Sequence, residues 1–279
     1  MKLNILFPVL NEHKRLERGI RMAALYLEML SKKEGSILYG EDYRLTIVDN
    51  GSDDDTPEIG AALAAQYEEV EYVRIEERGV GIAFRTGVEQ NEAEIVGYMD
   101  IDLSTDLRNL AKMLRIFDKY PQVSYVNASR FHRKSVVTGR KWYRKITSAG
   151  LLILLKACFG MKATDAICGF TFMRRDTACS LVRQCSGERG WFYMIELLLR
   201  AERSGVRIVD LPVRWREDYD TTVKIPKTVK NYLINSVKLK AAFIMTSCVQ
   251  NRKCTQEFGL SPNTPLPSAK PGRIRFLFF

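Results

Sequence analysis

Residues 95–102 read IVGYMDID, an apolar run followed by two aspartates one residue apart. The run Ile95–Met99 is short and apolar, as is typical of a buried strand, so Asp100 and Asp102 should stand at the carboxyl end of that strand. Two carboxylates held close together repel each other unless a cation lies between them. The pair therefore predicts a cation site, although taken alone it is equally consistent with an ordinary turn.

The composition is that of a globular chain with an unusual charge. With 279 residues, 46% of them hydrophobic, the chain can bury a large core in one domain, or in one domain with a small appendage. Its net charge of +10 predicts an anionic partner, which could be nucleic acid, a membrane surface or a phosphorylated ligand. The basic residues form no recognisable nucleic-acid-binding motif, so we expect no nucleic-acid partner.

Cysteine and histidine usage disfavours two classes of protein. The six cysteines include no C-x-x-C pair and there are two histidines, which argues against a zinc site and against a secreted disulfide scaffold. The apolar part of Met1–Phe7 is too short for a signal peptide, and no apolar run approaches the ~20 residues needed to span a bilayer. We therefore expect reduced thiols and a cytoplasmic location.

The first half of the chain alternates strand and helix. The hydrophobic pattern predicts strands at 3–7, 45–48, 70–75 and 95–99, with helices at 16–27, from 56 and at 81–89. At the second helix, Thr56 has the form of an N-cap and Pro57 stands at the first helical position. Such βαβ units predict an α/β fold, a mostly parallel sheet with helices on both faces and a ligand site at the carboxyl ends of its strands.

Three of these four predicted strands are followed by a polar or acidic loop. The loops contain Asn11-Glu12, residues 49–55 and residues 100–102. Each loop alone suits a turn or a helix cap, because Asp, Asn, Gly and Ser are common turn residues. All three should meet at one edge of the sheet, which favours a shared ligand site.

The motifs in these loops resemble the inverting, metal-dependent nucleotide-sugar glycosyltransferases of the GT-A type, family two. FPVLNE at 7–12 is similar to that family's P-x-x-N-E, VDNGSDDDT at 48–56 to its V-D-D-G-S-x-D-x-T, and Asp100-Ile101-Asp102 stands at its D-x-D position. The resemblance implies a GT-A Rossmann-like fold. It also implies that Pro8, Asn11, Glu12, Asp49, Asn50, Asp54 and Asp100 bind the nucleotide-sugar.

By the same resemblance, Asp100 and Asp102 are catalytic residues that hold Mg²⁺ or Mn²⁺, with Asp102 as the direct ligand and Asp100 acting through the metal or the ribose. Carboxylates suit these oxygen-preferring ions, which can take up charge on a diphosphate leaving group. Two positions depart from the family. Asn50 replaces an aspartate, which leaves the choice between a UDP- and a GDP-hexose open, and Val80 replaces a lysine in the glycine-rich segment 78–87. We expect the glycines of that segment to allow close helix packing rather than to bind phosphate.

The second half is similar to a narrower group, the polyprenyl-phosphate (dolichyl-phosphate type) mannosyl and glucosyl synthases. The similarity lies in DAICGFTF at 165–172, in the aromatic-x-x-E pattern from Tyr193 to Glu196 and in the segment 205–213, and it covers roughly residues 1–225. It implies that Arg130, from an S-R element, and Arg144 with Ser148, from an R-x-x-x-S element, bind the acceptor phosphate. Arg216 and Lys224 fall in a basic loop that would close over the diphosphate of the nucleotide-sugar.

The acceptor decides which other groups the reaction needs. A polyprenyl phosphate is already anionic at neutral pH and needs no base, whereas a saccharide or lipopolysaccharide hydroxyl would need one, and Asp165 or Glu196 would then be the catalytic base. A polyprenyl phosphate is the expected acceptor. Transfer to a hydroxyl is the alternative, and an inactive nucleotide-sugar-binding scaffold is the alternative outside the enzymes, because the family pattern is broken at Asn50 and Val80.

We expect three parts in the chain: a glycosyltransferase domain at 1–225, a basic amphipathic C-terminal helix at 226–247 and a flexible basic, proline-rich tail at 248–279. The apolar run Leu151–Leu155, flanked by lysines and arginines, fits a core helix or one that faces a membrane. The helix at 227–245 would lie on a membrane, cover the sheet or pair with another subunit. We expect a peripheral protein on the cytoplasmic face of a membrane, and leave open a homo-oligomer or a membrane partner subunit.

Overall fold

The computed structural model describes residues 1–217 and 225–258 of the chain. The chain divides into two compact units, one from Met1 to Asn235 and the other from Ser236 onwards. The last helix, α8 (Ile225–Phe258), begins in the first unit and ends in the second. Lys224 and the part of the predicted 248–279 tail that follows residue 258 lie outside the described residues, and the predicted domain boundaries at 225 and 247 stay predictions.

A seven-stranded sheet forms the centre of the first unit. Its strands, in spatial order, are β3 (Val70–Ile75), β2 (Tyr43–Asn50), β1 (Leu3–Val9), β4 (Ile95–Met99), β7 (Phe170–Arg174), β5 (Tyr125–Ser129) and β8 (Ile208–Pro212). β7 runs antiparallel to both of its neighbours, and the other pairings are parallel. The predicted α/β fold with a mostly parallel sheet is confirmed.

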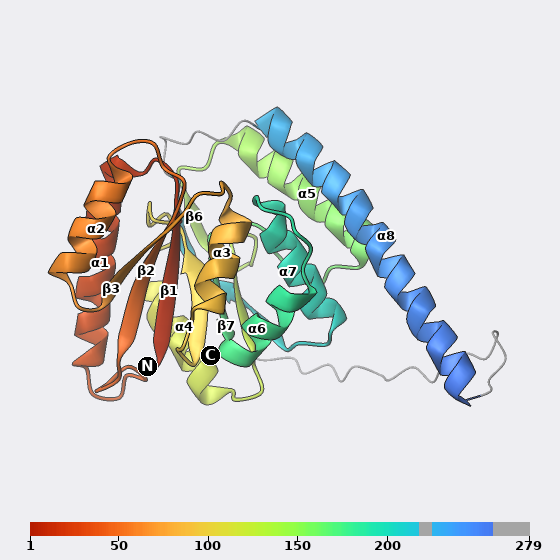
Figure 1. Ribbon diagram of the computed structural model, residues 1–279, viewed down its shortest axis with the longest axis horizontal. Helices are drawn as coiled ribbons and strands as arrows, with labels where there is room; N and C mark the ends of the chain where they lie inside the picture. Colours follow the sequence, from red (N-terminus) through yellow and green to blue (C-terminus); the bar gives the residue numbers. More distant parts are fainter. Residues whose placement is uncertain (218–224, 259–279) are drawn as a thin grey trace. The chain divides into compact units, whose positions relative to one another are not determined.

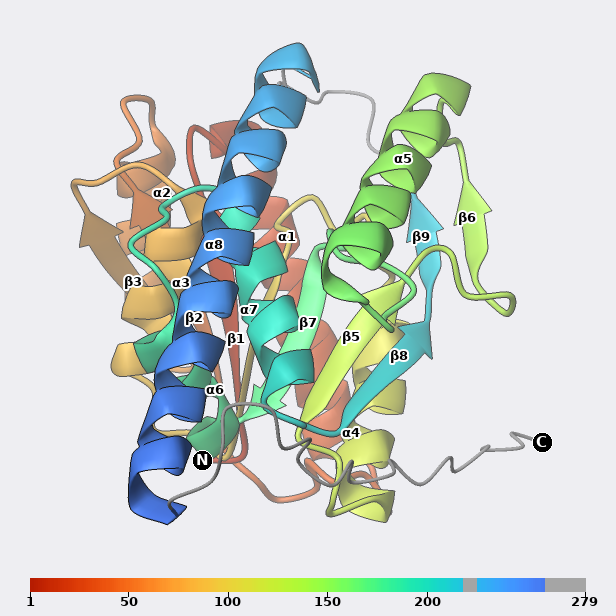
Figure 2. The same ribbon diagram turned by 90° about the vertical axis from the view of Figure 1, so that its right-hand side faces the viewer.

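Helices cover both faces of this sheet (Figures 1 and 2). One face carries α1 (His13–Ser31), α2 (Thr56–Gln66) and α4 (Arg108–Lys119), and the other carries α3 (Val80–Glu89), α6 (Arg175–Gln184) and α7 (Phe192–Arg203). A second, parallel sheet of two short strands pairs β6 (Val136–Thr138) with β9 (Arg214–Arg216). The helix α5 (Trp142–Phe159) follows β6 in the chain.

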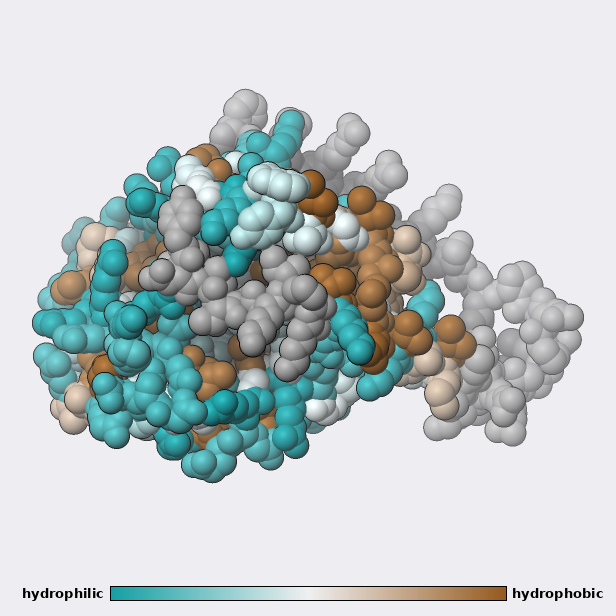
Figure 3. Space-filling view, turned by 90° about the horizontal axis from the view of Figure 1, so that it is seen from above, coloured by the Kyte–Doolittle hydropathy of each residue, from teal (hydrophilic) through white to brown (hydrophobic). Residues whose placement is uncertain are grey.

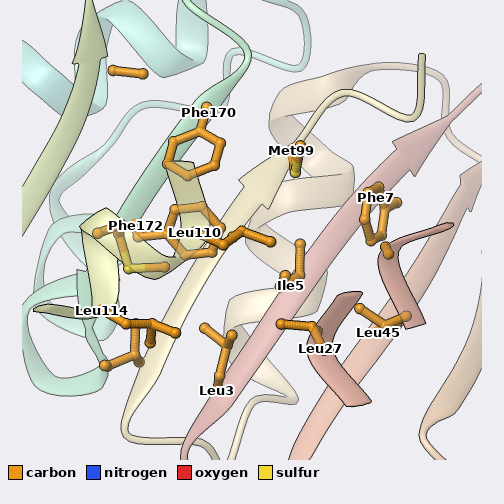
Figure 4. Close-up of a cluster of buried hydrophobic side chains, with 14 of the residues drawn as sticks. Leu3, Ile5, Phe7, Leu27, Leu45, Met99, Leu110, Leu114, Phe170 and Phe172 are labelled. Carbon is orange, nitrogen blue, oxygen red and sulfur yellow. The ribbon is translucent and has the colours of Figure 1, made fainter. Parts of the chain in front are cut away.

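Helices cover both faces of the central strand β1, and its residues are apolar on both faces apart from the buried Asn4, which accepts a hydrogen bond from Thr46. Leu3, Ile5 and Phe7 point into the core that α1 and α4 cover, as Figure 4 shows. Leu6 points to the opposite face, where a Cβ added at Gly87 of α3 would lie 2.7 Å from the Leu6 side chain. The close approach of α3 to β1 therefore requires glycine at position 87, as the packing interpretation of the glycine-rich segment predicts.

Two local predictions differ from the structure. Thr56 is the first residue of α2 rather than its N-cap, and its hydroxyl accepts a hydrogen bond from the backbone N–H of Glu12 instead of capping the helix. The last helix continues to Phe258, past its expected end at residue 245, because neither glycine nor proline occurs in the chain between Met245 and Gly259. Among the described residues, no helix combines the length and the apolar character needed to cross a bilayer.

Candidate active site

The loops that follow β1 and β2 are bound to each other at the carboxyl edge of the sheet. Asn11 donates its backbone N–H to the Ser52 hydroxyl at 2.9 Å and its side-chain amide to Asp53 at 2.6 Å, while its side-chain oxygen accepts from the Asp53 N–H at 3.0 Å. The Glu12–Thr56 hydrogen bond adds a further link. Figure 3 views this end of the molecule from above, and the coloured surface in the left-hand part of the view is mostly hydrophilic. The structure thus brings Pro8, Asn11, Glu12 and the loop after β2 to one place.

Asp49 and Asn50 are buried beneath these loops, and their side-chain oxygen and nitrogen atoms form hydrogen bonds. The Asp49 carboxylate accepts hydrogen bonds from the Ser52 N–H at 2.9 Å and the Tyr72 hydroxyl at 2.7 Å, and it pairs with Arg74 at 3.3 Å. Burial, together with the hydrogen bond to Asp49, raises the pKa of Tyr72 to about 12. Asp49 therefore connects the start of the loop after β2 to Tyr72 and Arg74 on β3.

The side-chain amide of Asn50 joins two segments by donating and accepting at once. Its Nδ2 donates to the carbonyl oxygen of Val9 at 2.6 Å, and its Oδ1 accepts from the N–H of Gly79 at 2.9 Å. An aspartate could not donate to the Val9 carbonyl. The departure from the family pattern at this position is therefore matched to the local backbone.

Asp54 lies at the start of α2 and pairs with His13 of α1. Its carboxylate lies 2.5 Å from His13 Nδ1 and accepts from the Thr56 N–H at 2.9 Å. Although partial burial opposes ionisation, these hydrogen bonds lower the pKa of Asp54 to about 2. The group is therefore an anion at neutral pH, at the edge where the nucleotide-sugar was expected.

Asp100 and Asp102 follow β4 at the same edge, and their carboxylates differ in their partners. Asp102 accepts hydrogen bonds from the backbone N–H and the hydroxyl of Ser104, both at 2.8 Å. Among the described residues, no donor binds the Asp100 carboxylate, which packs directly on Gly169. A Cβ at position 169 would lie 1.7 Å from Asp100 Oδ2, so only glycine leaves room for this carboxylate.

Backbone strain is concentrated in the two loops that hold these acidic residues. Within the described part of the chain, Asn11 (φ 57°) and Leu103 (φ 54°) are the residues other than glycine that adopt positive φ. A left-handed conformation costs a bulky residue such as leucine roughly 1–2 kcal/mol, and such strain is often found at functional sites. Asn11 is itself a predicted ligand in the loop after β1, and Leu103 directly follows the predicted ligand Asp102 in the loop after β4.

The two aspartates fit a site for a divalent cation whose other ligands come from a bound molecule and water. Burial and the neighbouring Asp102 raise the pKa of Asp100 to about 7, because a second negative charge in this place lacks compensation. Within the described residues, no group of three or more His, Cys, Asp or Glu side chains could enclose a metal by itself. One or two carboxylates completed by phosphate oxygens and water is the arrangement that Mg²⁺ favours.

Asp165, a candidate base, forms a buried ion pair with Arg130. Arg130 donates from Nε at 2.8 Å and from Nη2 at 2.9 Å to the two carboxylate oxygens, and its backbone N–H donates to the same group at 3.0 Å. Despite complete burial, the charge of Arg130 keeps the pKa of Asp165 below its usual value. A carboxylate with a low pKa and engaged oxygens is a weak base.

Glu196, the other candidate base, is similarly engaged. Its buried carboxylate on α7 accepts from the backbone N–H of Ser186 at 2.8 Å, the Ser186 hydroxyl at 2.5 Å and Arg200 Nε at 2.7 Å. It therefore fixes the loop that precedes α7. In that loop, the Arg189 carbonyl accepts hydrogen bonds from the N–H groups of Gly81 and Ile82 at the start of α3.

Arg144 and Ser148, the predicted phosphate ligands on α5, each bind a different residue. Arg144 pairs with the buried Glu217 at 2.9 Å, and its buried Nε has no hydrogen-bond partner among the described residues. Ser148 accepts a hydrogen bond at 2.6 Å from Arg140, a residue that the sequence motifs did not indicate. Arg216 lies exposed on β9, between Trp215 and Glu217.

Comparison with known proteins identifies the family. The model of glycosyl transferase family 2 matches residues 5–179, which include the loops after β1, β2 and β4. The chain belongs to glycosyl transferase family 2. The predicted family and the predicted enzyme class, a nucleotide-sugar-dependent hexosyltransferase, are confirmed.

Three relatives illustrate the similarity of this glycosyltransferase to known proteins. It is 26% identical over 240 residues to the glycosyltransferase AglD of Haloferax volcanii, matching 82% of this chain and 35% of AglD. It is 28% identical to the dolichyl-phosphate β-glucosyltransferase ALG5A of Trichomonas vaginalis, over 82% of this chain and 70% of the relative. The dolichyl-phosphate β-glucosyltransferase of Mus musculus is 28% identical, over 77% of this chain and 68% of the relative.

Solved structures agree in fold with this glycosyltransferase. Glucosyl-3-phosphoglycerate synthase from Mycobacterium tuberculosis, crystallised with Mn²⁺, UDP-glucose and phosphoglyceric acid, superposes with a TM-score of 0.62 at 17% identity, over 86% of this chain and 80% of that chain. At that identity the similarity concerns the fold.

The sequence motifs of this glycosyltransferase did not indicate Arg140, which the structure brings to the predicted phosphate ligand Ser148. It precedes α5 and lies eight positions before Ser148, so the helical spacing that links Arg144 to Ser148 does not include it. A signal was nevertheless present, since Arg140 is one of several cations before the apolar run on α5.

Proposed function

We propose that the protein transfers glucose from UDP-glucose to the phosphate of a polyprenyl lipid of the dolichyl type. The single observation that carries the choice of acceptor is the engagement of both candidate bases. Asp165 is held by Arg130, and Glu196 by Ser186 and Arg200, so neither is free to take a proton from a hydroxyl. Dolichyl-phosphate β-glucosyltransferases among the relatives support glucose and a lipid phosphate.

In the proposed reaction, an oxygen of the acceptor phosphate attacks the anomeric carbon from the face opposite the diphosphate. The new carbon–oxygen bond forms as the bond between that carbon and the diphosphate breaks, and UDP leaves with the electron pair. The acceptor is already an anion at neutral pH, so no residue removes a proton during transfer. The anomeric configuration is inverted.

The donor would bind at the carboxyl edge of the sheet. The loops after β1 and β2, fixed to each other through Asn11 and Ser52, would line the nucleotide pocket together with Pro8, Glu12, Asp49, Asn50 and Asp54. Asp102 and Asp100 would hold Mg²⁺ or Mn²⁺, which when bound supplies positive charge to the diphosphate as it leaves. Arg216, exposed on β9, would contact the same diphosphate.

A membrane surface would present the acceptor. On α5, Trp142, Ile146 and Ile153 are 72%, 62% and 69% exposed, and Lys145 and Lys156 are exposed on the same helix. Exposed apolar side chains beside lysines suit the interface of an anionic leaflet. We place the protein at the cytoplasmic face of a membrane, as a peripheral protein.

The test is a transfer assay with radiolabelled UDP-glucose and three acceptors, which are polyprenyl phosphate, the matching polyprenol and a free saccharide. We expect labelled product only from the phosphate, extracted into organic solvent and releasing glucose in mild acid, and we expect no product with Asp102→Asn. Transfer to the polyprenol or the saccharide but not to the phosphate would overturn the proposal. Binding of UDP-glucose without transfer to any acceptor would favour the inactive scaffold.

A further inference from the structure

Three arginines and two carboxylates lie together between β5, the start of α5 and the end of β9. Arg130 pairs with Asp165, and Arg144 pairs with Glu217. The third arginine is Arg140, whose guanidinium lies over the rings of Phe131 at 5.2 Å and Trp215 at 5.8 Å from the ring centres. The cluster therefore has one positive charge more than its carboxylates balance.

The guanidinium of Arg140 differs from those of Arg130 and Arg144 in its partners. Among the residues whose side chains the structure describes, no carboxylate lies within ion-pair distance of its guanidinium. Its Nη2 donates to Ser148 Oγ at 2.6 Å and to the Arg144 carbonyl at 3.4 Å. In the same described part of the chain, Nε and Nη1 have no acceptor, and neither is a buried atom, so solvent reaches both.

Burial lowers the pKa of Arg140, and a bound anion would raise it again. Desolvation, and then the nearby Arg130, lower the pKa of Arg140 to about 10, and the charges of Asp165 and Glu217 only partly oppose this shift. The group therefore remains a cation at neutral pH whose burial is only partly compensated. The two aromatic rings hold the guanidinium plane in place, which reduces the entropy lost when it binds a ligand. A fixed guanidinium with free N–H groups matches the oxygen spacing of a phosphate.

A series of contacts connects Arg140 to the aspartates that we propose bind the donor. Trp215 stacks with Arg140 and also lies 5.5 Å from Arg130, whose partner Asp165 precedes the Cys168-Gly169 segment. Gly169 in turn contacts the Asp100 carboxylate. Arg130 therefore lies near both Arg140 and the donor aspartate Asp100, because its charge interacts with each of them.

We propose that Arg140, with Ser148, binds the phosphate group of the acceptor lipid, while Arg130 and Arg144, each already paired with a carboxylate, frame the site. This inference rests on the proposed function, since it names the residue that recognises the acceptor. It adds a phosphate ligand that the sequence motifs did not include.

The test uses the full-length protein with three variants: Arg140→Gln, Arg140→Lys and the control Arg133→Gln. Arg133 is an exposed arginine in the same connection between β5 and α5. The KM values for polyprenyl phosphate and for UDP-glucose and the melting temperature are measured for each protein. Calorimetry with farnesyl phosphate and with farnesol measures acceptor binding without turnover.

For Arg140→Gln we expect the KM for polyprenyl phosphate to rise about 10- to 100-fold, the effect of losing a charged hydrogen-bonding group, with the KM for UDP-glucose unchanged. Arg140→Lys should fall between this variant and the wild type, because lysine keeps the charge but not the planar donors. If the glutamine variant does not fold, the lysine variant alone must show a raised acceptor KM. Farnesyl phosphate should bind the wild type more tightly than farnesol, and Arg140→Gln should abolish this preference.

An acceptor KM within twofold of the wild-type value in Arg140→Gln would overturn the role of Arg140 but leave the proposed function standing. A parallel rise in both KM values with a lowered melting temperature would also overturn it, because that result indicates a structural role. A wild-type protein that does not transfer glucose to polyprenyl phosphate would instead refute the proposed function. Equal binding of farnesyl phosphate and farnesol by the wild type would refute the phosphate site even without turnover.

Discussion

At the scale of single residues, the site depends on groups that fit one local geometry and no other. Asn50 must donate to Val9 and accept from Gly79, and Gly169 must leave space for the Asp100 carboxylate. The first requirement is about hydrogen-bonding chemistry, and the second is about volume. Each can be tested by the smallest substitution that violates it.

Asn50→Asp replaces a donor by an acceptor of the same size. The new carboxylate would face the Val9 carbonyl, so we expect the free energy of unfolding to fall by about 1–3 kcal/mol, the cost of a buried polar group without its partner. Urea unfolding at neutral pH measures this change. Gln122→Glu makes the same amide-to-carboxylate change at an exposed position, and an equal effect of the two substitutions would count against the assigned role of Asn50.

Gly169→Ala adds one methyl group against Asp100. Because that methyl would lie 1.7 Å from Asp100 Oδ2, the carboxylate must move, and a displacement of this kind should lower kcat/KM for the nucleotide-sugar by about 10- to 100-fold. Gly150→Ala is the matched control, since a Cβ at Gly150 meets open space. Unchanged metal-dependent activity in Gly169→Ala would show that Asp100 is not held in the geometry that catalysis needs.

At the scale of elements, the sequence predicts buried strands well and tertiary contacts poorly. The strands at 70–75 and 95–99 match β3 and β4, because a short apolar run between turns has few alternatives. The antiparallel insertion of β7 between β4 and β5 was not predicted, since it depends on pairing between distant residues. For the same reason, the Thr56 hydroxyl was expected to cap α2 but instead binds the Glu12 N–H across the site.

In the candidate site, too, the sequence predicts the positions of loops but not the contacts between distant residues. The loops with Asn11, Asp49 and Asp100 could be placed from sequence because they end neighbouring parallel strands. The pairing of Arg130 with Asp165 joins residues 35 positions apart and has no local signature. Arg140 was missed because its partners, Ser148 and the Trp215 ring, belong to other segments.

The exposed face of α5 carries a prediction of its own. Ile153→Glu places a charge where we propose contact with lipid, so it should weaken binding to anionic vesicles at least about tenfold, because burying one aliphatic side chain contributes roughly 1.5–3 kcal/mol. Vesicle sedimentation measures the binding. Leu25→Glu on α1, where Leu25 is 66% exposed, is the control, and equal losses in both variants would contradict a specific role for α5.

At the scale of the whole molecule, family, fold and charge are consistent with one activity. The chain belongs to glycosyl transferase family 2, its sheet brings the acidic loops to one edge, and its net charge of +10 suits an anionic lipid and an anionic donor. The engaged candidate bases, and an Arg140 that pairs with no carboxylate among the described residues, both favour an acceptor that is already an anion. We therefore expect transfer of the sugar to a phosphate oxygen with inversion.

The linkage in the product distinguishes this transfer from transfer to a hydroxyl. After reaction of UDP-glucose with polyprenyl phosphate, NMR should show the anomeric proton of glucose coupled to phosphorus, with the configuration inverted from α in the donor to β in the product. An anomeric carbon bonded to a hydroxyl oxygen of an acceptor, without phosphorus coupling, or a product that retains the α configuration, would contradict the account.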